Sequence, residues 1–215
     1  ANVQGYRPLQ MARVALIIAL PQLVLGPAVA LLLYRKWVDA RFVFAAGLGL
    51  IAAACFSGMQ LTSDWNRDQF VAVQALHALG QPMAVGAMLF LATSVVQPQE
   101  GPYVSGLINT LRAFGSLAGA AVVAQLMTVR GRFHREMLLD HAGLAAAIPD
   151  GSGPAQLAAV VGQQSLVLSV GDAYFLLGVL ALLLVPLALK LTHVPAPDLR
   201  AASAPPPVPS PSSQG

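Results

Sequence analysis

Charge is scarce in this sequence. Lys, Arg, Asp and Glu make up 10% of its 215 residues, whereas soluble domains carry about a quarter. Hydrophobic residues make up 56%. This balance excludes intrinsic disorder for most of the chain, and it excludes a water-soluble enzyme domain built around a single core. The composition indicates a membrane protein.

Cysteine and clustered basic residues are also lacking. Cys55 is the single cysteine, so no intrachain disulfide and no cysteine-based metal site can form. The net charge is +3, but the twelve Lys and Arg are scattered one or two at a time between apolar runs. No basic patch is left to contact phosphates, so we expect no nucleic-acid partner.

Motifs of catalysis and cofactor binding are missing as well. The sequence holds no Gly-rich phosphate loop, no dinucleotide-binding fingerprint and no candidate Ser/His/Asp set. No second His or carboxylate stands at metal-ligand spacing in any apolar run. We therefore expect neither a metal nor a cofactor, and no enzymatic activity.

Five apolar runs are long enough to cross a bilayer, whose hydrocarbon core of about 30 Å needs roughly 20 helical residues. They cover residues 14–34, 42–61, 69–96, 103–129 and 170–191. Because they lack the alternation of barrel strands, they predict helices. The expected fold class is all-α, a polytopic transmembrane helix bundle with five spans.

The remaining segments are predicted to lie outside the bilayer. They are an N-terminal stub (1–13), a loop (130–169) and a disordered Pro-rich tail (195–215). In the loop we expect the fourth helix to continue, break at a turn cluster, and be followed by a second short helix from about Ala155. The chain begins at Ala1 without Met, so we expect a fragment whose natural N-terminus lies upstream.

Basic residues beside the spans set the expected orientation. Over all flanks they are nearly balanced, but the short loop from Arg35 to Arg41 carries three of them, and short loops weigh most. This loop and the tail are therefore predicted to be cytoplasmic. The N-terminal stub and the 130–169 loop are then extracytoplasmic.

Few ionisable groups fall within the predicted spans. All nine acidic residues lie outside the spans or at their edges, so no embedded carboxylate for proton coupling is evident. Arg112 lies about 15 Å into its span, near the bilayer midplane, and shares one helix face with Ser105, Asn109 and Ser116. A charge at that depth needs a partner or a wet cavity. We interpret Asn109 and Arg112 as lining a substrate path; the alternative is a structural Arg bonded to backbone carbonyls.

A second polar face lies in the third run, where Gln74, His77 and Gln81 have helical spacing. We place Gln74 and His77 in the same substrate path. The alternative is that His77 only donates a hydrogen bond to a neighbouring helix.

Small residues in the fourth run suggest close helix packing. Gly115 and Gly119 form a GxxxG pattern, and Gly106 precedes them. Such spacing lets two membrane helices approach closely. We expect these glycines to pack helices within one bundle, with homodimerisation as the alternative.

Several patterns resemble the major facilitator superfamily. They are a Pro-bearing first run (Pro21, Pro27), the loop motif Asp39-x-Arg41, and Gln74-x-Leu76-x-x-x-Gly80 in the third run. The pattern Asn109-x-x-Arg112-x-x-Gly115-x-x-x-Gly119 is similar to the penultimate helix of the fourteen-spanner drug/proton antiporters of the EmrB/QacA type. The resemblance covers about residues 5–195.

This resemblance implies that the five runs are spans ten to fourteen of a transporter in a bacterial cytoplasmic (inner) membrane. It implies a missing N-terminal half as partner, and a cytoplasmic gating loop that holds Asp39 and Arg41. The function expected is export of multidrug or lipophilic, amphipathic compounds by alternating access, with proton antiport and a possible periplasmic membrane-fusion adaptor. The alternative is a non-transporting membrane interaction protein or an inert truncated remnant.

Overall fold

The structure, a computed structural model, describes residues 8–35, 37–60, 67–97, 99–144 and 154–193. These ranges contain no strand and form five helices: α1 (Pro8–Leu33), α2 (Ala40–Met59), α3 (Arg67–Thr93), α4 (Gly101–Leu144) and α5 (Pro154–Leu189). Four of them, α2 to α5, are long and apolar enough to cross a membrane, and α1 adds a shorter apolar segment, Ala19–Leu33. The all-α prediction is confirmed, and the chain has the helices of a multi-pass membrane protein.

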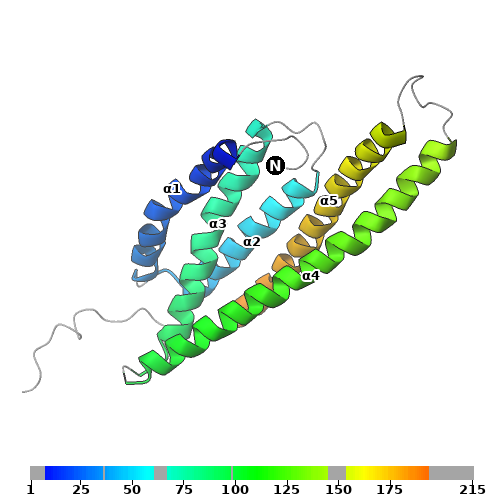
Figure 1. Cartoon of the computed structure of the whole chain (residues 1–215). Helices are drawn as coiled ribbons and strands as arrows, with labels where there is room; N and C mark the ends of the chain where they lie inside the picture. Colours follow the sequence, from blue (N-terminus) through cyan, green and yellow to red (C-terminus); the bar gives the residue numbers. More distant parts are fainter. Residues whose placement is uncertain (1–7, 36, 61–66, 98, 145–153, 194–215) are drawn as a thin grey trace, which may run out of the picture.

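The helices pack in an order that differs from the chain order. α1 packs on α3, α3 on α2, α2 on α5, and α5 on α4, so the row reads α1, α3, α2, α5, α4 (Figure 1). α2 therefore has a neighbour on each side, and 44% of its apolar window is buried, whereas none of the corresponding window of α4 is. The bundle is built around α2, and α4 lies at its edge.

Two glycines bring α2 and α3 into close contact. A Cβ added to Gly47 of α2 would lie 2.5 Å from the backbone nitrogen of Ala84 in α3, and one added to Gly80 would lie 3.0 Å from the carbonyl oxygen of Gly47. Neither backbone can move aside without separating the helices. Small side chains give membrane helices their close van der Waals contact, so this crossing depends on glycine.

The contact of α2 with α5 follows the same principle. Gly58 of α2 faces the ring of Tyr174, and Gly178 of α5 faces Cys55 and Phe56, each at 3.1 to 3.2 Å from the position of an added Cβ. Cys55 is 3% exposed. Its thiol is therefore enclosed by the packed interface.

α4 and α5 are longer than the predicted spans. α4 has 44 residues and α5 has 36, which correspond to about 66 Å and about 54 Å of helix at 1.5 Å per residue. The fourth helix continues beyond residue 129, as expected. The prediction of a separate short helix from about Ala155 is wrong, because that segment is the first part of α5. Gln163, Gln164 and Ser165 lower the hydropathy of this segment, but Gln and Ser do not break a helix.

Several predicted boundaries meet the structure only in part. α1 begins at Pro8, so residues 8–13 of the predicted N-terminal stub are helical. The turn cluster at 149–153 and the 195–215 tail lie outside the described residues. The membrane position of the stub, the 130–169 segment and the tail stays a prediction.

The predicted packing role of Gly106, Gly115 and Gly119 stays a prediction, because the described part of the chain places no other helix against them. No atom of the described chain lies within 4 Å of a Cβ added to any of the three, and every residue from Leu111 to Ala120 is exposed. The close approaches occur at Gly47 and Gly80 instead. A GxxxG pattern shows that a helix can be approached closely, but it does not show which helix carries a neighbour.

Gly47→Ala tests the crossing of α2 and α3. The added methyl group has no free space, so we expect a loss of about 1–3 kcal/mol of stability, as for other overpacked cores. Unfolding in detergent can be followed with a thiol-reactive dye, because the buried Cys55 becomes accessible only when the bundle opens. Gly49→Ala is the matched control, since nothing lies within 4 Å of its added Cβ. Equal stability of the two variants would contradict this account of the crossing.

Candidate functional site

A charged contact lies at the end of the bundle where α2 begins and α5 ends. Asp39 is the N-cap of α2, and its Oδ1 accepts a hydrogen bond of 3.0 Å from the backbone nitrogen of Arg41. An Asp at this position satisfies one of the free N–H groups of the first helical turn. The local sequence thereby fixes both side chains at the start of α2.

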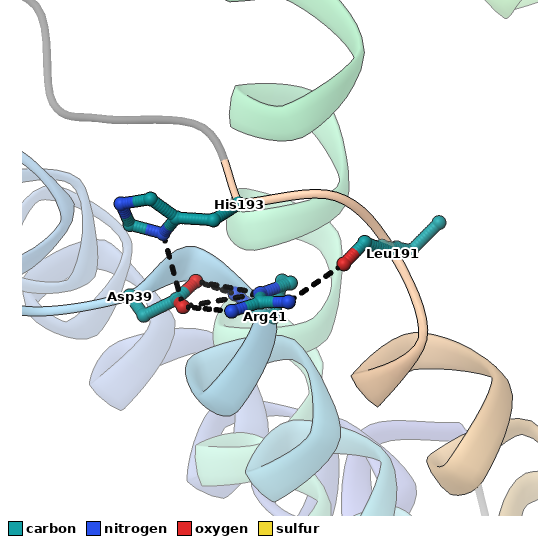
Figure 2. A network of polar contacts seen from close by, with 4 residues as sticks. All are labelled: Asp39, Arg41, Leu191 and His193. Carbon is teal, nitrogen blue, oxygen red and sulfur yellow. Dashed lines mark hydrogen bonds and ion pairs between the residues drawn. The ribbon is translucent and has the colours of Figure 1, made fainter.

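The Arg41 guanidinium connects this helix start to α5 (Figure 2). Its Nη2 and Nε donate to Oδ2 of Asp39 at 2.7 and 3.0 Å, and its Nη1 donates to the carbonyl oxygen of Leu191 at 2.8 Å. Nδ1 of His193 lies 3.1 Å from the same carboxylate oxygen. The contact therefore satisfies a carbonyl just beyond the C-terminus of α5. We call Asp39, Arg41, Leu191 and His193 the clamp.

The electrostatics of the clamp keep its carboxylate ionised. The hydrogen bonds from the Arg41 side chain, helped by its backbone N–H and by His193, lower the pKa of Asp39 from 3.8 to about 2, against the opposing effect of desolvation. The Asp39 side chain is 15% exposed and that of Arg41 is 25% exposed. Asp39 is thus ionised at physiological pH.

The clamp brings together both residues that the sequence assigned to a gating loop. It also shows that the start of α2 and the segment after α5 lie at the same end of the bundle. Which side of a membrane this end faces stays a prediction.

A cavity of about 440 Å³ opens between the second half of α3 and the start of α4. Asn109, Arg112 and Ser105 contribute its polar groups on the α4 side. Arg112 lies about 16 Å along α4 from Gly101 at 1.5 Å per residue, and it has no hydrogen bond or ion pair with another described residue. The remaining lining is mostly apolar and comprises Val85, Met88, Leu89, Thr93, Val96, Gln97, Gly101, Val104 and Ile108.

The other two residues predicted for the substrate path do not line this cavity. His77 lies about 16 Å along α3 from Met88, a lining residue, at 1.5 Å per residue, and its Nδ1 lies 3.4 Å from the carbonyl oxygen of Val73 in its own helix. Gln81, on the same face, bonds Gln22 of α1 at 2.6 Å. Asn109 and Arg112 thus share a cavity, and a role of Gln74 and His77 in a substrate path stays a prediction.

A second charged cluster lies between α4 and α5, and sequence reasoning missed it. Oδ2 of Asp172 accepts a hydrogen bond of 2.6 Å from Nε of Arg130 and lies 2.7 Å from Nε2 of His134. Beside this cluster, Gly131 and the fully buried Ser169 let the two helices approach. We call Arg130, His134 and Asp172 the acidic cluster.

A signal for this cluster was present in the sequence. Arg130 and His134 stand four residues apart, and Ser165, Ser169 and Asp172 recur at helical spacing. Because residues 130–169 were assigned to a loop, the two faces were not placed opposite each other. The long α4 and α5 align them.

Neither metal-binding groups nor similarity to known proteins assigns a function to these sites. Among the described residues, no three His, Cys, Asp or Glu side chains are grouped as a metal ion would require. The chain matches no family model, no curated protein and no solved structure. The candidate site is therefore defined by its own geometry: the clamp, the α3–α4 cavity and the acidic cluster.

The lowered pKa of Asp39 makes the clamp sensitive to strong acid. A carboxyl group whose pKa is depressed by folding stabilises the fold above its unfolded pKa and loses this contribution as pH falls through the folded value. The contribution of Asp39 should therefore be complete above about pH 4 and vanish toward about pH 2.

Thermal unfolding of the wild type and of Asp39→Asn, followed by circular dichroism across this pH range, measures the contribution. Asn keeps the N-cap hydrogen bond and removes only the charge. The wild type should be the more stable protein at neutral pH, and the difference should disappear in acid. A difference that stays constant with pH would rule out an ionic clamp.

Proposed function

We propose that this chain is the C-terminal part of a multidrug or lipophilic-compound exporter of the major facilitator type, which works by alternating access with proton antiport. The observation that carries the proposal is the α3–α4 cavity, where Arg112 stands on a helix of membrane-spanning length without a partner among the described residues. An intramembrane charge is costly and points to a functional site. A water-filled or substrate-filled cavity supplies the compensation that Arg112 needs.

The composition of the cavity favours amphipathic organic substrates. Its volume of about 440 Å³ lies within the range of about 300–1,000 Å³ for small-molecule sites. Apolar side chains from α3, such as Met88 and Leu89, form one wall, and the opposite wall holds Asn109 and Arg112. Burial against the first wall would supply affinity, and the polar wall would orient an anionic or polar part of the substrate.

The packing order of the helices is compatible with a carrier whose helices move relative to one another during transport. α4 joins the bundle through α5, and α5 is held to α2 by glycine contacts and by the clamp. In the proposed cycle the clamp closes the cytoplasmic end of the chain, and the exposed face of α4 contacts the N-terminal half. The proposal places the protein in a bacterial inner membrane, with a periplasmic membrane-fusion adaptor as a possible partner.

The exposed face of α4 also favours a second candidate function. A membrane helix with no buried residue in its apolar window suits a non-transporting protein that binds another membrane protein through Gly106, Gly115 and Gly119. The two candidates differ in what Arg112 does. An exporter needs the Arg112 side chain for substrate, whereas an interaction protein needs the small residues of the helix face.

Arg112→Ala and Arg112→Lys test the exporter. The assay is efflux of a fluorescent lipophilic cation and of a fluorescent lipophilic anion from cells that produce this chain with the nine preceding spans that the proposal requires. Ala removes the charge and Lys keeps the charge but loses the planar fork, so we expect export of at least one substrate to fall by about tenfold or more in Ala and less in Lys. Leu111→Ala, an exposed position outside the cavity lining, is the control and should export normally.

The amount of inserted protein must be measured in the same cells. Normal export by a well-inserted Arg112→Ala variant would refute the exporter role of the residue. Loss of insertion in both Arg112 variants would show a structural role and would favour the interaction protein.

A further inference from the structure

Hydrogen-bond geometry fixes which nitrogen of His134 carries hydrogen. Nε2 lies 2.7 Å from Oδ2 of Asp172, and an ionised carboxylate can only accept, so Nε2 is the donor. Nδ1 is buried and has no hydrogen-bond partner among the described residues. In the neutral ring this nitrogen holds a free lone pair. It is the atom of the acidic cluster that is available to accept a proton.

The net charge of the acidic cluster changes when Nδ1 of His134 accepts a proton. With His134 neutral, the charges of Arg130 and Asp172 cancel, and Arg130 stays protonated at all physiological pH. A proton on Nδ1 converts the ring of His134 to an imidazolium, and the negative charge of the neighbouring Asp172 carboxylate stabilises this imidazolium. The new Nδ1–H is buried without an acceptor, and such a group destabilises the packing around it. Proton binding is therefore possible in this interface, but it opposes the present packing of α4 against α5.

The surroundings of His134 give a proton access to the cluster. The side chain of Asp172 is 27% exposed and that of Arg130 is 41% exposed, while His134 is only 10% exposed. Two further charges of α4, Arg132 and Arg135, line a separate groove of about 420 Å³ beside Ser165 and Ser169. The charge from α5 in contact with His134 is that of Asp172.

We propose that His134 and Asp172, held in place by Arg130, form a proton-binding site that links proton uptake to the packing of α4 against α5. The proton comes from water, the lone pair of Nδ1 accepts it, and no bond of the chain breaks. The inference rests on the proposed exporter function, to which it adds the group that binds the coupling proton. This site lies about 26 Å from the end of α5 at Leu189, at 1.5 Å per residue. It is therefore in the middle of α5, beside the C-terminus of α2, where Gly171 faces the carbonyl oxygen of Met59.

Nitrogen-15 NMR of the purified, histidine-labelled chain in nanodiscs tests proton binding. His134 should show the Nε2–H tautomer at high pH and take up a proton on titration from about pH 9 to about pH 4. Asp172→Asn should weaken proton binding at His134 by at least about tenfold, because it removes the neighbouring negative charge. His141, an exposed residue of the same helix, is the control, and its titration should not change.

Spin-label distances test the link to packing. On a Cys55→Ala background, labels at the exposed Leu139 of α4 and Val160 of α5 should move apart when the pH is lowered. His134→Gln, which cannot take up the proton, should abolish the change. This second readout does not require that Asp172→Asn folds.

The two readouts decide the proposal. A His134 ring that binds no proton over this range, or whose proton affinity is unaffected in a folded Asp172→Asn protein, overturns it. So does a distance change that persists in His134→Gln. Both measurements use the chain without any substrate, so a failure of drug export with an intact His134 titration counts against the exporter proposal alone.

Discussion

Charged side chains are costly in hydrocarbon, and the ion pairs of the described residues lie at two places only, the clamp and the acidic cluster. Between them, α5 runs from Ala173 to Leu189 without a charged residue. From Asp172 to its end at Leu189 this helix extends over about 26 Å at 1.5 Å per residue, close to the thickness of about 30 Å of a hydrocarbon core. In the arrangement that we propose, the two ionic contacts mark the two boundaries of the layer that the bundle crosses. The first parts of α5 and the last part of α4 extend beyond it.

Within this layer the helices are held together by close packing at glycine residues. Gly47 and Gly80 join α2 to α3, and Gly58 and Gly178 join α2 to α5. Lipid is as apolar as a leucine side chain, so close contact between small residues, not hydrophobic burial, decides which membrane helices associate. α4 departs from this pattern, because Gly106, Gly115 and Gly119 face outward. Its Arg112 lies about 27 Å from Arg130 along the helix at 1.5 Å per residue, toward the clamp side of the layer, and lines a cavity. This combination is why the proposed function is centred on α4.

The fold class and the positions of the five helices could be predicted from the sequence, because long apolar runs between charges allow few other structures. The ends of α4 and α5 could not, since Gln163, Gln164 and Ser165 lower hydropathy without breaking a helix. The clamp was half predictable: Asp39 and Arg41 were singled out by the resemblance to a transporter family, but their contact with Leu191 depends on where α5 ends. The acidic cluster was missed because His134 and Asp172 are 38 residues apart and meet only through the antiparallel packing of α4 on α5. For the glycines, their spacing indicates that one face of a helix lacks large side chains. Only the packing order of the helices shows which of these faces contacts another helix.

The central claim is that α5 crosses the bilayer between the acidic cluster and the clamp, with the clamp in the cytoplasm. Single cysteines at Val160, Leu177, Leu183 and Thr192, each on a Cys55→Ala background and treated with an impermeant maleimide, test it most directly. The account predicts labelling of position 160 in intact cells, labelling of position 192 only after the membrane is opened, and no labelling of positions 177 and 183 in either case. Labelling of positions 160 and 192 from the same side, or labelling of position 177 from either side, would contradict it.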